Sequence, residues 1–148
     1  MTARLIETGR DLPESLPEVV GDAERLRRVV MNLVGNAVKF TPEGGEIRVA
    51  ARVSESKDRV LVSVSDTGPG IARQFHRAIF DRFAAVQTDG AAGRTSSGLG
   101  LTFAKMVAEA HKGQILLDSE PGRGSMFTLS LPALKACSQR YPGRAVTV

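Results

Sequence analysis

Residues 32–42 read NLVGNAVKFTP, and this stretch closes a segment whose apolar side chains recur every three or four positions. The apolar positions are Leu26, Val29, Val30, Leu33, Ala37 and Phe40. This spacing predicts an amphipathic helix that begins at Ala23, with Asp22 as its N-cap. Pro42 ends the helix, because a proline disfavours helical backbone at the residue before it, Thr41.

One stripe of this helix is polar. Asn32, Asn36 and Lys39 lie at positions i, i+4 and i+7, so they share one face. A solvated surface would explain such a stripe, although asparagine is a poor residue for a helix interior. The alternative is a binding face, since an amide oxygen is a suitable ligand for Mg²⁺ and an ammonium group can neutralise a phosphate.

Further along the chain, the loop DTGPG at residues 66–70 directly follows the alternating segment VLVSVS at residues 60–65. The carboxylate of Asp66 at the end of such a strand can accept a hydrogen bond from the exocyclic amino group of adenine. Guanine carries an acceptor at that position and would be disfavoured. Gly68 and Gly70 allow backbone to approach a flat ring closely. The loop alone fits an ordinary Asp-Gly turn equally well.

A third feature is the turn SGLGL at residues 97–101, which opens a predicted amphipathic helix over Leu99–Ala110. Free N–H groups and the positive end of a helix form a natural cradle for phosphate. Residues 88–97 before it show no periodicity and predict a mobile loop. A single Gly-x-Gly is weak evidence, and the Gly-Lys-Ser/Thr of a Walker A loop is absent.

The remaining pattern predicts a mixed sheet. The expected elements are a short strand and connector in the first twenty residues, a hairpin of strands over 47–53 and 60–64, a short helix over 72–83, and strands over 114–118 and 125–131 joined by a turn at 120–124. The expected fold class is an α+β two-layer sandwich with helices packed on one face of the sheet. We expect one domain over residues 1–134 and a flexible tail over 135–148.

Composition narrows the function classes. The chain has 148 residues, a net charge of +4 and one cysteine. Its basic residues are scattered without interleaved aromatics, which argues against nucleic acid as a partner. No run of about 18 apolar residues and no signal-peptide core occur, so we expect a cytoplasmic segment without membrane contact. A membrane anchor elsewhere in a parent protein stays open.

The motifs follow one another as NxxxNAxKF, DxGxGI, IFxxF, GLGL and GxGS. This order resembles the catalytic ATP-binding domain of sensor histidine kinases, within the GHKL superfamily that includes the gyrase, mismatch-repair and heat-shock chaperone ATPases. The resemblance runs from about Leu12 to Pro132 and implies the Bergerat α/β sandwich. It implies ATP and Mg²⁺ as cofactors, with an ATP lid over residues 88–97 and a hydrophobic anchor at Ile79, Phe80 and Phe83.

The resemblance also implies roles for individual residues. Asn36 would hold Mg²⁺ with support from Asn32, Lys39 would reach the phosphates, and these three form the expected catalytic set. Asp66 would select adenine, and Ser125 would join a water bridge to the purine. The expected ATP-binding set is Asn36, Lys39, Phe40, Asp66, Gly68, Gly70, Ile71, Ser97, Gly98, Leu99, Gly100, Leu101 and Ser125.

The implied reaction is transfer of the ATP γ-phosphoryl group to a histidine on a separate dimerisation domain, in the same parent protein or in trans, with a response regulator downstream. Asn32 stands where gyrase-type relatives carry a glutamate base, so rapid ATP hydrolysis and an anti-sigma-type serine kinase are both disfavoured. His76 and His111 lack a His-Glu/Asp context and predict structural roles, His111 as a cation at a helix end.

Two departures from the family pattern keep an alternative open. Ala85 stands where the family usually carries Arg, Lys or Gln, and Ser96 stands where a glycine is usual. The alternative is a degenerate kinase-like module that binds nucleotide or a partner protein without transferring phosphate.

Overall fold

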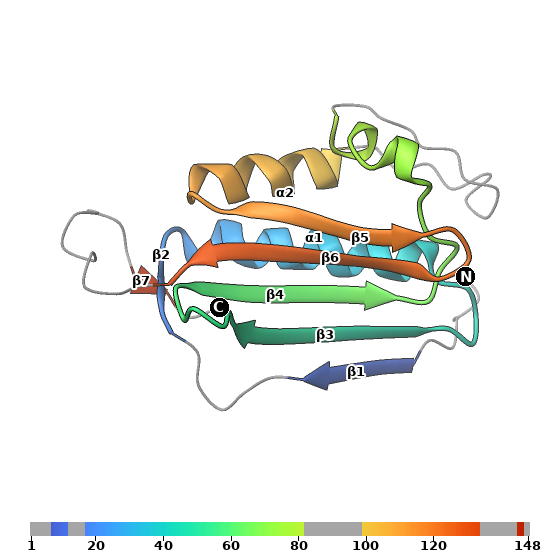
Figure 1. The fold of residues 1–148 in the computed structure, drawn as a ribbon, viewed down its shortest axis with the longest axis horizontal. Coiled ribbons are helices and arrows are strands. Elements are labelled where there is room, and N and C mark those ends of the chain that lie inside the picture. The colour runs from blue at the N-terminus through green and yellow to red at the C-terminus, as the bar shows by residue number, and fades with distance from the viewer. Residues whose placement is uncertain (1–6, 12–16, 82–98, 134–144, 147–148) are drawn as a thin grey trace.

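The computed structural model describes residues 7–11, 17–81, 99–133 and 145–146. Its main sheet has five strands in the order β1-β3-β4-β6-β5. The strands are β1 (Glu7–Asp11), β3 (Glu46–Val53), β4 (Arg59–Asp66), β5 (Gln114–Glu120) and β6 (Gly124–Pro132). Strand β1 pairs parallel with β3, and the other pairs are antiparallel. Helices α1 (Ala23–Phe40) and α2 (Leu99–Ala110) lie on one face of the sheet (Figure 1), so the predicted two-layer sandwich with a mixed sheet is confirmed.

Helix α1 begins and ends where the sequence predicts. The carboxylate of Asp22 caps its start by accepting a hydrogen bond of 3.1 Å from the Arg25 N–H. At its end, the Thr41 hydroxyl donates to the Ala37 carbonyl over 2.6 Å. Thr41 itself has extended backbone, as expected before Pro42.

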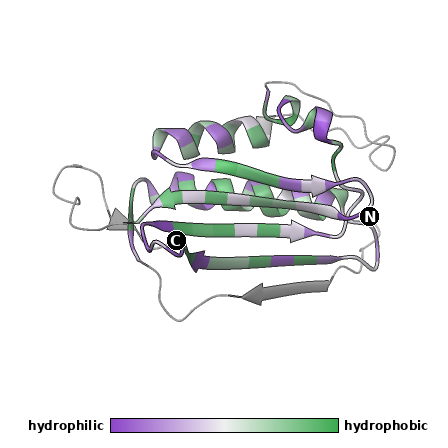
Figure 2. Ribbon diagram, in the orientation of Figure 1, coloured by the Kyte–Doolittle hydropathy of each residue, from purple (hydrophilic) through white to green (hydrophobic). Residues whose placement is uncertain are grey.

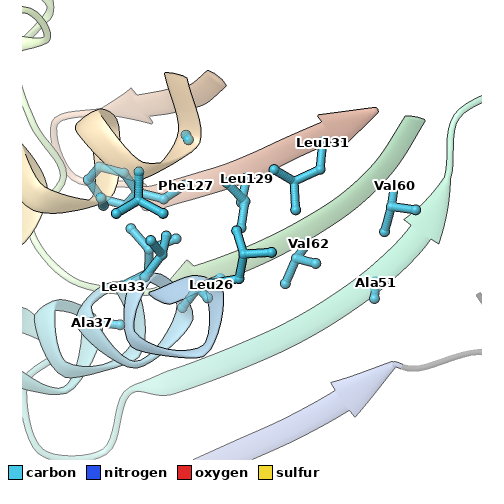
Figure 3. Packing of buried hydrophobic residues seen from close by; sticks show 14 of the residues in the cluster. Leu26, Leu33, Ala37, Ala51, Val60, Val62, Phe127, Leu129 and Leu131 are labelled. Atoms are coloured by element: carbon cyan, nitrogen blue, oxygen red, sulfur yellow. The ribbon is translucent and has the colours of Figure 1, made fainter. Parts of the chain in front are cut away.

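The core lies between the helices and the sheet (Figure 3). Val60, Val62 and Val64 alternate along β4 and are almost fully buried, as are Leu129 and Leu131 on β6. Leu33 of α1 packs in the same cluster (Figure 3). In Figure 2 both helices carry hydrophobic and hydrophilic positions, and hydrophobic positions colour much of β4. The period-2 strands and the period-3.6 helices therefore contribute one apolar face each.

His111 fastens the two helices together at the end where α1 begins. The backbone N–H of Asp22 donates to Nε2 of His111 over 2.9 Å, and Nδ1 lies 2.7 Å from the Val107 carbonyl. Because Nε2 accepts, Nδ1 carries the proton and donates to Val107. The predicted structural role of His111 is confirmed, but the expected cation at the helix end is wrong, because this pairing needs the neutral ring.

The prediction of one helix over residues 72–83 is wrong in the described part of that stretch. It forms two short 3₁₀ turns, η1 (Arg73–Phe75) and η2 (Ala78–Phe80), and residues 82 and 83 lie outside the described residues. Among the described residues, no side chain caps the start of either turn, and an α-helix of so few residues has little stability of its own. Packing of Ile79 in the core instead fixes the chain here.

Two further short strands were not predicted. Strand β2 (Val19–Val20) pairs antiparallel with β7 (Ala145–Val146), which lies in the segment expected to be a flexible tail. Two residues per strand are too few for an alternation pattern to be recognised in the sequence. The domain boundary at residue 134 stays a prediction. Within the described ranges, no helix combines the length and the apolar character needed to cross a bilayer.

Candidate functional site

The predicted site residues that the structure describes gather at one end of the sandwich. Strand β4 and helix α1 end there, at Asp66 and Phe40. Strand β6 and helix α2 begin there, at Gly124 and Leu99 (Figure 1). Segments far apart in the sequence thus bring their ends to one region.

Asp66 is half-buried and held by backbone donors. Its Oδ1 accepts a hydrogen bond of 2.8 Å from the Gly68 N–H, and the Ser125 N–H also bonds to the carboxylate. Ser125 is the register partner of Asp66 on the neighbouring strand. Burial raises the pKa of Asp66 above its ordinary value, and the two backbone hydrogen bonds offset part of that rise. The carboxylate is therefore held in one direction by its backbone donors.

The loop that carries Asp66 fits between α1 and the turn that joins β5 to β6. A Cβ at Gly68 would lie 2.9 Å from the Phe40 carbonyl oxygen, so the loop backbone at Gly68 lies close against the end of α1. On the other side, the Gly122 N–H donates to the Pro69 carbonyl over 2.8 Å. Gly70, with φ +76°, would place a Cβ 2.0 Å from the Glu120 carbonyl oxygen. Only glycine permits both approaches.

Asn32 connects α1 to the start of α2. Its Nδ2 donates to the Gly100 carbonyl over 3.3 Å. The N–H groups of Gly100 and Leu101 lie in the first turn of α2, where a helix offers no internal acceptor. The side-chain amide of α1 and the glycine turn that the sequence singles out are therefore in contact.

Asn36, Lys39 and Phe40 follow Asn32 along α1 and are half-buried. The eight helical steps from Asn32 to Phe40 span about 12 Å. One end of this stretch contacts Gly100 and the other contacts Gly68. Asn36 and Lys39 thus lie between the glycine turn and the Asp66 loop.

Part of the predicted site cannot be placed. Ser97 and Gly98 lie outside the described residues, as do the expected lid at 88–97, Phe83, Ala85 and Ser96. Leu99 is described only as the first residue of α2. The other two anchor residues are in packing positions, because Ile79 is 5% exposed and the Phe80 ring meets Phe127 edge-to-face with centroids 6.2 Å apart.

Sequence reasoning missed Ser119 on β5. Its buried hydroxyl accepts a hydrogen bond of 2.7 Å from the N–H of Ile71, the residue that follows the glycine loop. Ile115, Leu117 and Ser119 alternate along the strand, which places a serine on the helix-facing side. A polar residue at an apolar position of the strand pattern could have identified Ser119.

The pKa of Asp66 leads to a prediction about stability. Because the pKa is raised on folding, the folded state favours the protonated carboxyl, and this contribution to stability is lost as pH rises through the raised pKa. Over that interval we expect the free energy of unfolding of the wild type to fall relative to that of Asp66→Asn. Urea denaturation at a series of pH values measures the difference; a relative gain by the wild type as pH rises would contradict it.

Comparison with known proteins agrees with this geometry. Residues 21–135 match the family model described as histidine kinase-, DNA gyrase B- and HSP90-like ATPase. The adaptive-response sensory kinase SasA of Crocosphaera subtropica is 38% identical over 135 residues, which cover 91% of this chain and 35% of that protein. SasA of Thermosynechococcus vestitus is 43% identical over 122 residues, or 82% of this chain and 31% of that protein. The chain thus spans about a third of the length of these relatives.

Solved structures show the same likeness. Full-length ShkA in complex with AMPPNP superposes with a TM-score of 0.74 at 36% identity, covering 88% of this chain and 26% of that one. The mycobacterial sensor histidine kinase MprB gives a TM-score of 0.73 at 29% identity, covering 86% of this chain and 82% of that one.

Proposed function

Because the chain belongs to the histidine kinase-, DNA gyrase B- and HSP90-like ATPase family, we propose that it is the catalytic ATP–Mg²⁺-binding domain of a two-component sensor histidine kinase. It would donate the γ-phosphoryl group of ATP to a histidine on a separate domain. The observation that carries the proposal is the convergence of the Asp66 loop, the polar face of α1 and the start of α2 at one end of the sandwich.

The base would bind beside Asp66. Its carboxylate can accept a hydrogen bond from the 6-amino group of adenine, and its two backbone donors fix its direction. Gly68 and Gly70 leave the adjoining wall without side chains, which suits the flat face of a purine. Phe40 at the end of α1 would lie against the nucleotide.

The triphosphate would extend along α1 towards Gly100. The N–H groups in the first turn of α2 would donate hydrogen bonds to phosphate oxygens, and Lys39 would neutralise part of the phosphate charge. Mg²⁺ commonly takes one or two protein oxygens together with phosphate oxygens, and the amide of Asn36 fits that donor set. The ion, when bound, would supply charge neutralisation on the transferred phosphoryl group.

The chain's own residues favour transfer over hydrolysis. Asn32 occupies the position of the glutamate base in gyrase-type relatives, and its amide donates to the Gly100 carbonyl. An amide cannot take a proton from water, so Asn32 would position the glycine turn rather than activate a nucleophile. Positioning and charge neutralisation are the main requirements of phosphoryl transfer.

The phosphate acceptor would come from another domain. His76 lies with Nε2 2.9 Å from the Ile71 carbonyl, and both ring nitrogens of His111 are engaged. The partners we propose are a histidine-containing dimerisation domain, of the same parent protein or in trans, and a response regulator downstream. We place this domain in the cytoplasm, where ATP is available.

Phosphotransfer from radiolabelled ATP to a separately produced dimerisation domain tests the proposal. Acid-labile, base-stable label on the dimerisation domain supports a kinase. ATP binding without label would support the degenerate module, which the loss of a polar side chain at Ala85 favours. Failure to bind ATP would contradict both.

Asn36→Ala tests the metal site. In the wild type we expect Mg²⁺ to tighten ATP binding about tenfold, which corresponds to about 1.4 kcal/mol. The variant should bind ATP equally well with and without Mg²⁺, because it lacks the amide oxygen. Calorimetric titration in Mg²⁺ and in EDTA measures this. Gly35→Ala is a matched control on the same helix, since a Cβ there meets no atom of the described residues within 4 Å. An undiminished Mg²⁺ effect in Asn36→Ala would rule out this assignment.

A further inference from the structure

Ser119, Ser125 and Asp66 form a row across three neighbouring strands. Ser119 of β5 is the register partner of Ser125 on β6, and Ser125 is the register partner of Asp66 on β4. Side chains of register partners point to the same face of a sheet. The next residue in the row, Ile47 of β3, is 2% exposed and belongs to the core, so the row faces the helices.

The hydroxyl of Ser119 has three hydrogen-bonding neighbours. The Ile71 N–H donates to it over 2.7 Å, the Gly124 carbonyl lies 2.9 Å away, and the Ser125 hydroxyl lies 2.8 Å away. A serine hydroxyl has one proton, and a carbonyl can only accept. All three contacts are hydrogen bonds only if Ser119 donates to Gly124. The proton between the two serines must then come from Ser125.

This arrangement determines what the row can offer to a ligand. The Ser125 hydroxyl donates its proton to Ser119 and therefore offers only lone pairs to a ligand. The ionised carboxylate of Asp66 beside it also presents only lone pairs. Ser119 and Ser125 are 8% and 9% exposed, so water has little access to disturb the pattern. The wall beside the base is therefore built from acceptors.

We propose that Ser119 is a positioning residue for base specificity. It accepts the hydroxyl proton of Ser125, so Ser125 cannot donate a hydrogen bond to the 6-carbonyl of a 6-oxopurine, and such bases bind weakly. The inference rests on the proposed ATP site. A base with a 6-amino group donates to Asp66, whereas a base with a 6-carbonyl finds no donor on the wall and leaves its oxygen unpaired. A site that leaves buried polar groups unpaired rejects a ligand strongly.

The test compares ATP with inosine triphosphate, whose base carries a 6-carbonyl, by calorimetric titration of the full chain. In Ser119→Ala the Ser125 hydroxyl is free to donate to that carbonyl. We expect the ATP-to-ITP affinity ratio to fall about tenfold, the effect of one hydrogen bond. A merely structural role would weaken both nucleotides equally and leave the ratio unchanged, which would overturn the inference.

Two further variants sharpen the test. In Ser119→Ala/Ser125→Ala the freed donor is gone, so the ratio should rise above that of Ser119→Ala; a ratio as low as in Ser119→Ala would also overturn the inference. Ser130→Ala is the matched control, because Ser130 is a buried serine of β6 that pairs with Arg59 instead, and its ratio should equal that of the wild type.

Folding and the primary function are controlled separately. Thermal unfolding shows whether each variant folds. If Ser119→Ala does not fold, Ser119→Cys is measured instead. The same fall in the ATP-to-ITP affinity ratio is expected, because a thiol is a weak hydrogen-bond acceptor. A wild type that binds neither nucleotide would refute the proposed function. A wild type that prefers ATP, with an unchanged ratio in the Ser119 variant, would refute the inference alone.

Discussion

Asp66→Ala is expected to weaken ATP binding about a hundredfold, since hydrogen bonds to charged groups are worth about 1.5–3 kcal/mol. The variant loses the carboxylate of the loop, which accepts from the 6-amino group more strongly than a neutral group can. Its affinity for ITP, which lacks that group, should change much less. Calorimetric titration of the full chain with both nucleotides measures the two effects.

The fold should survive this substitution. Asp66 is half-buried and its charge is already disfavoured by burial, so its removal relieves that cost and offsets part of the loss of its hydrogen bonds from the Gly68 and Ser125 N–H groups. Asp118→Ala serves as the control, because this exposed carboxylate lies on β5 away from the row that faces the helices. Tight ATP binding by a folded Asp66→Ala would remove Asp66 from the site.

Gly70→Ala is expected to have the largest effect on stability. A Cβ would lie 2.0 Å from the Glu120 carbonyl oxygen, and the backbone has φ +76°. Left-handed strain costs about 1–2 kcal/mol and overpacking about 1–3 kcal/mol, so the loss should be about 2–5 kcal/mol. Urea denaturation measures it.

Gly122→Ala separates the two causes. Gly122 has φ +83°, but a Cβ there meets nothing within 4 Å in the part of the chain that the structure describes, so its replacement should cost only the strain, about 1–2 kcal/mol. Nucleotide binding should fall in Gly70→Ala alone, because only there must the Asp66 loop move away from β5. Equal losses of stability in the two variants would mean that the contact with Glu120 is unimportant.

Local sequence pattern was sufficient to predict most of the helices and strands. The amphipathic repeat and the Asp22 cap fix α1, and the alternation of valines fixes β4, because both signals come from side chains close in sequence. The stretch 72–83 was predicted wrongly because its apolar residues also recur at helical spacing. There, packing of Ile79 in the core decides the conformation.

The sequence predicted which residues belong to the candidate site but not which of them contact one another. The motifs select Asn32, Gly100 and Asp66, yet nothing in the sequence says that the Asn32 amide meets the Gly100 carbonyl, 68 positions away. Ser119 was missed for a related reason. Its importance comes from three partners, the nearest of which lies five positions along the chain.

The helices cover only one face of the sheet, and this has a practical consequence for experiments on single molecules. Arg52 of β3 is exposed beside the buried Ala51, so its side chain points away from the helices, and it lies at the opposite end of the strand from Glu46 and the Asp66 loop. A fluorophore or a surface tether attached through a cysteine at this position, with Cys137 replaced by serine, would leave the proposed nucleotide site and the helical layer unobstructed.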